Sequence, residues 1–278
     1  MKVGFIDYYL DEWHANNYPA LIKECSDGRY TVGSAYAEID APNGMSNREW
    51  SEKYGIPLRE SIEEVIREND VLIVLSPDNP ERHPALCDLP LRSGKRVYVD
   101  KTFAVDAKTA REIFAIAEES QTPVCSSSAL RFASELTPLH NTEICRVYTE
   151  GPGLYDNYSI HQLEQIVSLI PSRPTRLMFT GDKNFPAMVI EFEDGRRAQL
   201  LHRNNDAYSF RTIVSDAQNH ATVAEIKSNF FRLFIEALIG YFDSGKLLAT
   251  HAETVSVIAL REAGLRAMET PFKWETVG

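Results

Sequence analysis

Residues 70–128 read "DVLIVLSPDNPERHPALCDLPLRSGKRVYVDKTFAVDAKTAREIFAIAEESQTPVCSSS". The five apolar residues at 71–75, closed by a proline and an asparagine, are typical of a central parallel strand that is buried on both faces. Further strands are predicted at 95–102 and 122–128, and a long helix at 107–120 lies between them. Strands that alternate with helices at this spacing predict a doubly wound parallel sheet with right-handed crossovers.

The same alternation runs back to the start of the chain. A strand is predicted at 3–6, a helix at 17–25 and a second strand at 30–39. Pro19 is tolerated only in the first turn of a helix, so we expect this helix to begin late and to follow a long loop. N-cap residues mark the starts of three more helices, and these are Ser46, Ser61 and Asp106. Residues 1–127 are therefore expected to form a Rossmann-like α/β domain.

Residues 128–278 show a different pattern. The predicted elements are strands at 175–181, 187–203 and 208–216, and helices at 230–243 and 252–268. The Asp194-Gly195 pair, flanked by alternating apolar residues, indicates a β-hairpin. We therefore expect an α+β domain with an open antiparallel sheet, whose closing helices can pack back on the first domain. The open face of such a sheet favours pairing with a second copy, so we predict a homodimer or tetramer through residues 175–216.

The composition is that of an acidic globular protein. Its 278 residues include 29 Lys and Arg against 40 Asp and Glu, a formal net charge of −11. Such a surface repels phosphate backbones and anionic lipid, so we expect neither nucleic acid nor a membrane as a partner. No apolar stretch approaches the ~20 residues of a membrane span, and the N-terminus reaches an acid too soon for a signal peptide. The cysteines lie far apart without a C-x-x-C pair, which indicates reduced thiols in a cytoplasm and no metal site; they are Cys25, Cys87, Cys125 and Cys145.

Three stretches carry a resemblance to a known family. The first contains Ser76, Pro77, His83, Gly94, Lys95 and Val97, followed by the tripeptide Asp100-Lys101-Thr102. The second is "NYSIHQLE" at 157–164, and the third is the closing helical stretch at 230–269. With these motifs the chain resembles the Gfo/Idh/MocA oxidoreductases, the group that contains glucose–fructose oxidoreductase and inositol dehydrogenase.

The resemblance implies an enzyme that uses NAD or NADP to oxidise a hydroxyl of a small carbohydrate-like substrate, a sugar or a cyclitol. Lys101 and His161 would handle the hydroxyl proton while hydride passes to the cofactor, because side chains cannot carry hydride. The candidate substrate contacts are Tyr155, Asn157, Glu164 and Arg131. The candidate cofactor contacts are Asp7, Tyr8, Tyr9, Glu38, Ser76, Pro77, Asp78 and Asp100. Asn157 stands where the family usually has a carboxylate, so the imidazolium form of His161 loses a supporting charge.

The loop after the first strand departs from the family pattern. Where the family has G-x-G-x-x-G, this chain places Asp7 and Tyr9 at the first two glycine positions, and two further carboxylates follow in the loop. Two like charges at contact distance repel by roughly 4 kcal/mol at an effective dielectric of 20. Pro19 is also expected to displace the helix N-terminus that would favour a phosphate. We therefore expect ordinary NAD(P) binding to be much weakened, although Glu38 can still reach a ribose hydroxyl.

Three hypotheses of different classes remain open. The first is an active oxidoreductase that uses an unusual loop geometry. The second is a catalytically silent relative that binds a sugar-like ligand or a protein partner. The third is a metal-assisted hydrolase or lyase, whose oxygen-rich donor set would suit a hard cation and would comprise Asp7, Asp11, Glu12 and His14.

Overall fold

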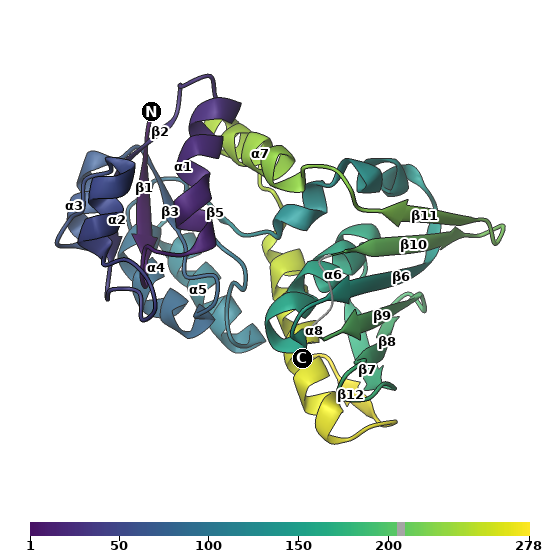
Figure 1. Cartoon of the computed structure of the whole chain (residues 1–278). Coiled ribbons are helices and arrows are strands. Elements are labelled where there is room, and N and C mark those ends of the chain that lie inside the picture. Colours follow the sequence, from purple (N-terminus) through teal and green to yellow (C-terminus); the bar gives the residue numbers. More distant parts are fainter. Residues whose placement is uncertain (205–208) are drawn as a thin grey trace. The chain divides into compact units, whose positions relative to one another are not determined.

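The computed structural model describes residues 1–204 and 209–278. Within them the chain divides into two compact units (Figure 1). Unit 1 consists of residues 1–127 and 235–250, and unit 2 consists of residues 128–234 and 251–278. The first residue of the strand predicted at 208–216 lies outside the described residues.

Unit 1 is built on a five-stranded sheet in which every pair of neighbouring strands is parallel. In spatial order the strands are β2 (Thr31–Ala37), β1 (Lys2–Asp7), β3 (Val71–Val74), β4 (Val97–Val99) and β5 (Val124–Cys125). The apolar run of the sequence forms the central strand β3, which is buried along its whole length, as predicted. The strand order reverses direction between β1 and β3, and sheets of this kind bind ligands at the carboxyl ends of the strands beside that point.

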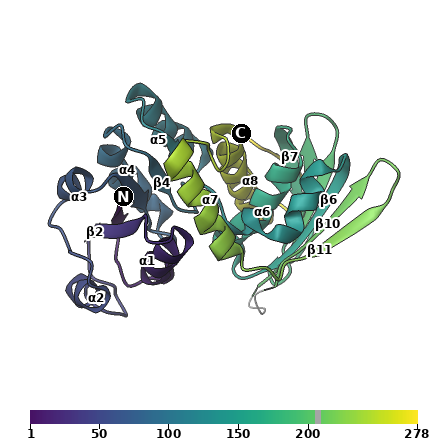
Figure 2. The same cartoon turned by 90° about the horizontal axis from the view of Figure 1, so that it is seen from above.

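Helices connect these strands and cover both faces of the sheet (Figure 2). They are α1 (Trp13–Cys25), α2 (Asn47–Tyr54), α3 (Ile62–Glu68), α4 (His83–Leu91) and α5 (Ala107–Glu119), with a short 3₁₀ turn, η1 (Pro80–Arg82). The predicted N-caps are confirmed, since the side chains of Ser46, Ser61 and Asp106 accept backbone N–H groups at the starts of α2, α3 and α5.

The prediction of a late start for the first helix is wrong. Helix α1 begins at Trp13 and contains Pro19 in its interior. The helix tolerates the proline because Glu12 caps its N-terminus and because Tyr18 and Ile22 are buried against the sheet side of the unit. Capping and burial together offset the roughly 3 kcal/mol that an interior proline costs. The helix N-terminus therefore stays directly behind the loop at residues 7–12.

Most of helix α7 (Phe230–Ser244) belongs to unit 1 through the segment 235–250. The Tyr241 hydroxyl lies 2.7 Å from the carbonyl oxygen of Pro123 and 3.1 Å from that of Val97. Near its end, Asp243 accepts a hydrogen bond of 2.8 Å from the Tyr30 hydroxyl. These contacts join a segment late in the sequence to the strands of the first half.

Unit 2 contains a seven-stranded sheet. In spatial order its strands are β11 (Ala221–Glu225), β10 (Arg211–Asp216), β6 (Ile144–Pro152), β9 (Arg197–Arg203), β8 (Ala187–Phe192), β7 (Pro174–Phe179) and β12 (Trp274–Thr276). The expected antiparallel sheet is confirmed except at one place, because β6 and β9 pair in parallel and the sheet is mixed. The hairpin at Asp194-Gly195 is present, and Gly195 adopts a positive φ of 84° that favours glycine.

One face of this sheet packs against helices α6 (Tyr155–Leu169) and α8 (His251–Glu269), and the other face carries no helix (Figures 1 and 2). Burial alternates strictly along β9, which shows that successive side chains point to the covered and the open face in turn. Two 3₁₀ segments, η2 (Ala129–Phe132) and η3 (Ser134–Asn141), precede the sheet. Within the described residues, every helix is too short or too polar to span a lipid bilayer.

Candidate functional site

The loop at residues 7–12 starts at the carboxyl end of β1, where unit 1 is expected to bind a ligand. Asp7 is the last residue of the strand and is only 1% exposed, and its Oδ1 atom accepts a hydrogen bond of 2.7 Å from the Tyr8 N–H. Burial raises the pKa of Asp7 well above its usual range, and the nearby Glu12 carboxylate adds to this shift.

Glu12 is the N-cap of α1. Its Oε2 atom accepts a hydrogen bond of 2.8 Å from the His14 N–H, and its Oε1 atom accepts one from the Ala15 N–H. These are the backbone donors with which the first helix of a Rossmann-like unit binds phosphate. The glycines of such a loop are absent, and a carboxylate of the chain itself lies on the phosphate-binding donors.

His14 lies between two carboxylates. Its Nδ1 atom is 2.8 Å from Glu12 Oε2 and its Nε2 atom is 3.7 Å from Asp100 Oδ2. Burial alone would lower the pKa of His14, but the charges of Asp100 and Glu12 outweigh burial and raise it. Asp100 also accepts a hydrogen bond of 3.0 Å from the Tyr98 hydroxyl. The sequence named His14 only for the metal hypothesis, and its contact with Asp100 could not be read from spacing because the two residues lie far apart in the chain.

Asp11, one of the donors proposed for a metal, accepts hydrogen bonds from other parts of unit 1. Asp11 Oδ1 accepts from Asn16 Nδ2 at 2.9 Å, and Asp11 Oδ2 accepts from the Met45 N–H at 2.8 Å. Among the described residues, no three His, Cys, Asp or Glu side chains are grouped as metal ligands. The hydrolase or lyase hypothesis therefore gains no support from this loop.

Glu38, the residue expected to bind the cofactor ribose, forms an ion pair with Arg82. Glu38, just after β2, accepts a hydrogen bond of 2.9 Å from Arg82 Nε and a second one from Arg82 Nη2. The Arg82 guanidinium lies over the ring of Tyr8, 5.0 Å from its centroid. Burial raises the pKa of Tyr9, with the Asp78 carboxylate as the next cause. Of the other predicted cofactor contacts, Ser76 and Pro77 are buried directly after β3, and Ser76 adopts a positive φ of 72°.

Lys101 follows Asp100 immediately after β4 and is partly buried. Its charge lowers the pKa of His14, against the larger effects of the two carboxylates. The structure thus brings four predicted residues of unit 1 to one edge of the sheet, the carboxyl edge: Asp7, Ser76, Asp100 and Lys101.

In unit 2, helix α6 carries three of the predicted residues, Asn157, His161 and Glu164. His161 Nδ1 lies 2.7 Å from Ser128 Oγ. The imidazole is flanked by the rings of Tyr158 and Phe210, with centroid distances of 5.4 and 5.8 Å. The sequence analysis missed Ser128, since its only signal was a run of three serines after β5.

Arg131 and Glu164, both predicted to contact substrate, form an ion pair with each other. Arg131 Nη1 is 3.0 Å from Glu164 Oε1, and Arg131 Nη2 is 2.5 Å from Glu253 Oε1 on α8. Tyr155 is buried, and its hydroxyl lies 3.2 Å from the Met188 sulfur. All three predicted residues thus make side-chain contacts within unit 2.

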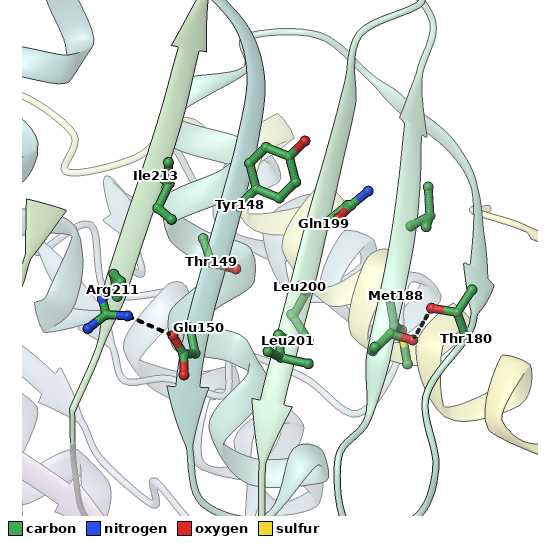
Figure 3. Close-up of a pocket in the computed structure, with 12 residues that line it drawn as sticks. Tyr148, Thr149, Glu150, Thr180, Met188, Gln199, Leu200, Leu201, Arg211 and Ile213 are labelled. Carbon is green, nitrogen blue, oxygen red and sulfur yellow. Dashed lines mark hydrogen bonds and ion pairs between the residues drawn. The ribbon is translucent and has the colours of Figure 1, made fainter. Parts of the chain in front are cut away.

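The open face of the unit 2 sheet carries a shallow hollow of about 380 Å³. Figure 3 shows its lining side chains, with Tyr148, Gln199 and Ile213 projecting from three neighbouring strands and an ion pair between Arg211 and Glu150 at one end. This hollow is open and belongs to the face that we predict to pair with a second copy.

Comparison with known proteins agrees with the fold. Residues 22–127 match the family model GFO_IDH_MocA, described as an oxidoreductase family with an NAD-binding Rossmann fold. The match begins only after the loop at 7–12, in which the chain departs from the family pattern. No curated protein matches the sequence.

Solved structures resemble the chain over its whole length. A probable dehydrogenase from Thermotoga maritima has a TM-score of 0.83 at 12% identity, with 100% of this chain and 99% of that chain covered. A putative myo-inositol dehydrogenase from Sinorhizobium meliloti 1021 has a TM-score of 0.80 at 13% identity, with 100% and 99% covered. GenD2 from gentamicin A biosynthesis, solved in complex with NAD, has a TM-score of 0.79 at 12% identity, with 100% and 97% covered. Residues 22–127 thus match the NAD-binding model of the Gfo/Idh/MocA oxidoreductases, and the chain as a whole has the fold of these solved dehydrogenases.

Proposed function

We propose that this protein binds a small polyhydroxylated molecule, a sugar or a cyclitol, with His161 as the residue of unit 2 that contacts a ligand hydroxyl. The observation that carries the proposal is the environment of His161 on α6. Its Nδ1 atom lies 2.7 Å from Ser128 Oγ, and this contact fixes the orientation of the imidazole ring. The rings of Tyr158 and Phe210 beside it suit the apolar C–H faces of a sugar ring.

The family supports the same class of ligand. The myo-inositol dehydrogenase and the UDP-N-acetylglucosamine 3-dehydrogenase among the similar structures are named for cyclitol and sugar substrates. Their likeness to this chain is one of fold, so the ligand class rests on the site in unit 2 together with the family-model match over residues 22–127.

Calorimetric titration with myo-inositol and with D-glucose tests the proposal. We expect saturable binding of at least one of them to the full-length protein, weakened at least about tenfold by His161→Ala, the loss expected of about one good hydrogen bond. His220→Ala is the matched control, because His220 is exposed and bonds only within its own turn to Asp216 among the contacts described. Affinity that is equal in wild type and His161→Ala would contradict the role of His161.

A second candidate is an active oxidoreductase that transfers hydride between the bound hydroxyl and NAD or NADP. The specific observation in its favour is Lys101, which lies within the matched family region directly after β4. In this candidate Lys101 would exchange the hydroxyl proton, and a bound nicotinamide would supply the hydride acceptor. Turnover followed by the absorbance of reduced nicotinamide tests it: Lys101→Ala should abolish turnover and leave the cofactor affinity largely intact.

We also propose that the protein is a dimer or tetramer through the open face of the unit 2 sheet. Leu201 is 44% exposed on this face and lies beside the hollow with Tyr148 and Ile213. Exposed apolar side chains rimmed by ion pairs such as Arg211–Glu150 are typical of protein–protein interfaces.

The cysteines described as free thiols support a reducing, cytoplasmic location.

A further inference from the structure

We propose that Glu12 is a built-in substitute for the cofactor pyrophosphate, and that it keeps the dinucleotide crevice of unit 1 closed to NAD and NADP. The proposal concerns unit 1 alone and does not depend on the ligand proposed for unit 2. It rests on three observations at the carboxyl edge of the sheet. The N–H groups at the start of α1 are bonded to Glu12, carboxylates next to them would repel a pyrophosphate, and the residue expected to bind the ribose forms an ion pair with Arg82.

The donors that a pyrophosphate needs are already bonded. In a Rossmann-like unit the phosphates approach the N-terminus of the helix that follows β1, and its first N–H groups point at them. Here that helix is α1, and the Glu12 carboxylate accepts from the N–H groups of His14 and Ala15. Glu12 is only 9% exposed, so the carboxylate is an interior part of the fold. A phosphate oxygen can reach these donors only if Glu12 leaves them.

The surrounding charges hold Glu12 in place. His14 Nδ1 lies 2.8 Å from Glu12 Oε2, and the same imidazole faces Asp100 with its other nitrogen at 3.7 Å. The His14 imidazole therefore contacts the Glu12 carboxylate, and the His14 backbone N–H donates a hydrogen bond to the same carboxylate. Asp7 lies close enough for its charge and that of Glu12 to act on each other. A pyrophosphate entering here would add two negative charges beside the Glu12 and Asp100 carboxylates that face His14.

The residue expected to bind the cofactor ribose, Glu38, is likewise bonded to another side chain of unit 1. An acidic residue after β2 normally binds the ribose hydroxyls of the cofactor. Glu38 occupies that place, but both hydrogen bonds from Arg82 go to its Oε2 atom, and the guanidinium stacks on Tyr8. Binding a dinucleotide would require this ion pair to open in addition to the displacement of Glu12.

The test is titration of the full-length protein with NADH and with NADPH, followed by calorimetry and by the fluorescence of Trp13, which is exposed beside Glu12. We expect no saturation of the wild-type protein by millimolar cofactor. Glu12→Ser keeps a good N-cap, removes the charge and opens the space, so it should tighten binding of at least one cofactor by about tenfold or more. Glu12→Gln keeps the shape of the cap and removes only the charge, and a smaller gain is expected.

Asp106→Ser is the matched control, since Asp106 is the carboxylate N-cap of α5, the helix after β4. It should leave cofactor binding at the wild-type level. Saturable wild-type binding at micromolar NADH or NADPH would overturn the proposal. Cofactor binding that stays undetectable in both folded Glu12 variants would overturn the assignment of the block to Glu12. Neither result bears on sugar binding at His161, so failure here is distinguishable from failure of the proposed function.

Discussion

Substituting Arg131 tests whether this residue contacts a ligand or stabilises the fold through its ion pairs with Glu164 and Glu253. Its side chain is 13% exposed and bonds Glu164 at 3.0 Å and Glu253 at 2.5 Å. Glu164 is the more deeply buried partner, with 5% of its side chain exposed, whereas Glu253 is 24% exposed and can turn to water. Substituting Arg131→Met keeps the length of the side chain and removes the charge, which leaves the Glu164 carboxylate buried without its cation.

Breaking a buried ion pair from one side costs roughly 3–5 kcal/mol, because the remaining charge keeps its desolvation penalty. Total stabilities of domains are about 5–15 kcal/mol, so the loss would be a large fraction of the stability of unit 2. We therefore expect the unfolding temperature of Arg131→Met to fall by on the order of 10 °C. The double variant Arg131→Met/Glu164→Leu should recover most of this loss, since it removes both charges and fills the space with apolar groups.

The assay is thermal unfolding followed by circular dichroism at neutral pH, with sugar affinity measured on the same samples at a temperature where each variant is folded. If the unfolding temperature recovers in the double variant, the broken Arg131–Glu164 ion pair is the cause of the lost stability. An unfolding temperature of Arg131→Met within about 2 °C of wild type, together with lost sugar binding, would refute the structural reading and restore Arg131 as a ligand contact.

Three further predictions concern pH, assembly and packing. The neighbouring carboxylates raise the pKa of His14 above 6.5, so the wild-type protein should be more stable than His14→Asn below about pH 6.5 and should lose this advantage as the pH rises through the folded-state pKa. Urea unfolding at several pH values measures the difference in free energy of unfolding. A difference that grows with pH would contradict the prediction. Leu201→Glu should convert a dimer or tetramer to monomer in light scattering. The control Leu89→Glu, on α4 of unit 1 where Leu89 is 37% exposed, should leave the assembly unchanged, and a wild-type monomer would refute the interface. Gly264→Ala should lower the free energy of unfolding by about 1–3 kcal/mol, because the added Cβ would come within 2.1 Å of the buried Tyr155 hydroxyl. Gly240→Ala places its Cβ where no atom lies within 4 Å, so it should stabilise α7 by about 0.5–1 kcal/mol. Equal effects of the two substitutions would contradict the close packing of α8.

Patterns local in the sequence predicted most of the fold. The run at 71–75 could only be a buried strand, and the caps Ser46, Ser61 and Asp106 marked helix starts because each side chain reaches a backbone N–H two or three residues away. The start of α1 was missed because a proline rule was weighed without Glu12. Glutamate is not among the preferred N-caps, so the role of Glu12 appears only once the backbone N–H groups of His14 and Ala15 are seen to donate to its carboxylate.

The candidate site could be predicted in part only. Lys101 was identified from the tripeptide after β4, and His161 from its place in "NYSIHQLE". Ser128, which fixes the His161 ring, lies 33 residues away in the chain, and Glu253, which shares Arg131 with Glu164, lies 122 residues from that arginine. Such contacts depend on how α6 and α8 pack in unit 2, and no spacing rule contains that information.

The central claim is that a carboxylate of the chain itself occupies the phosphate-binding donors of α1. The most direct measurement is a crystal structure of the wild-type protein grown with millimolar NADH. We predict that the Glu12 carboxylate remains on the N–H groups of His14 and Ala15, with no dinucleotide bound at the start of α1. A pyrophosphate bonded to those two N–H groups, with Glu12 turned away, would contradict the account.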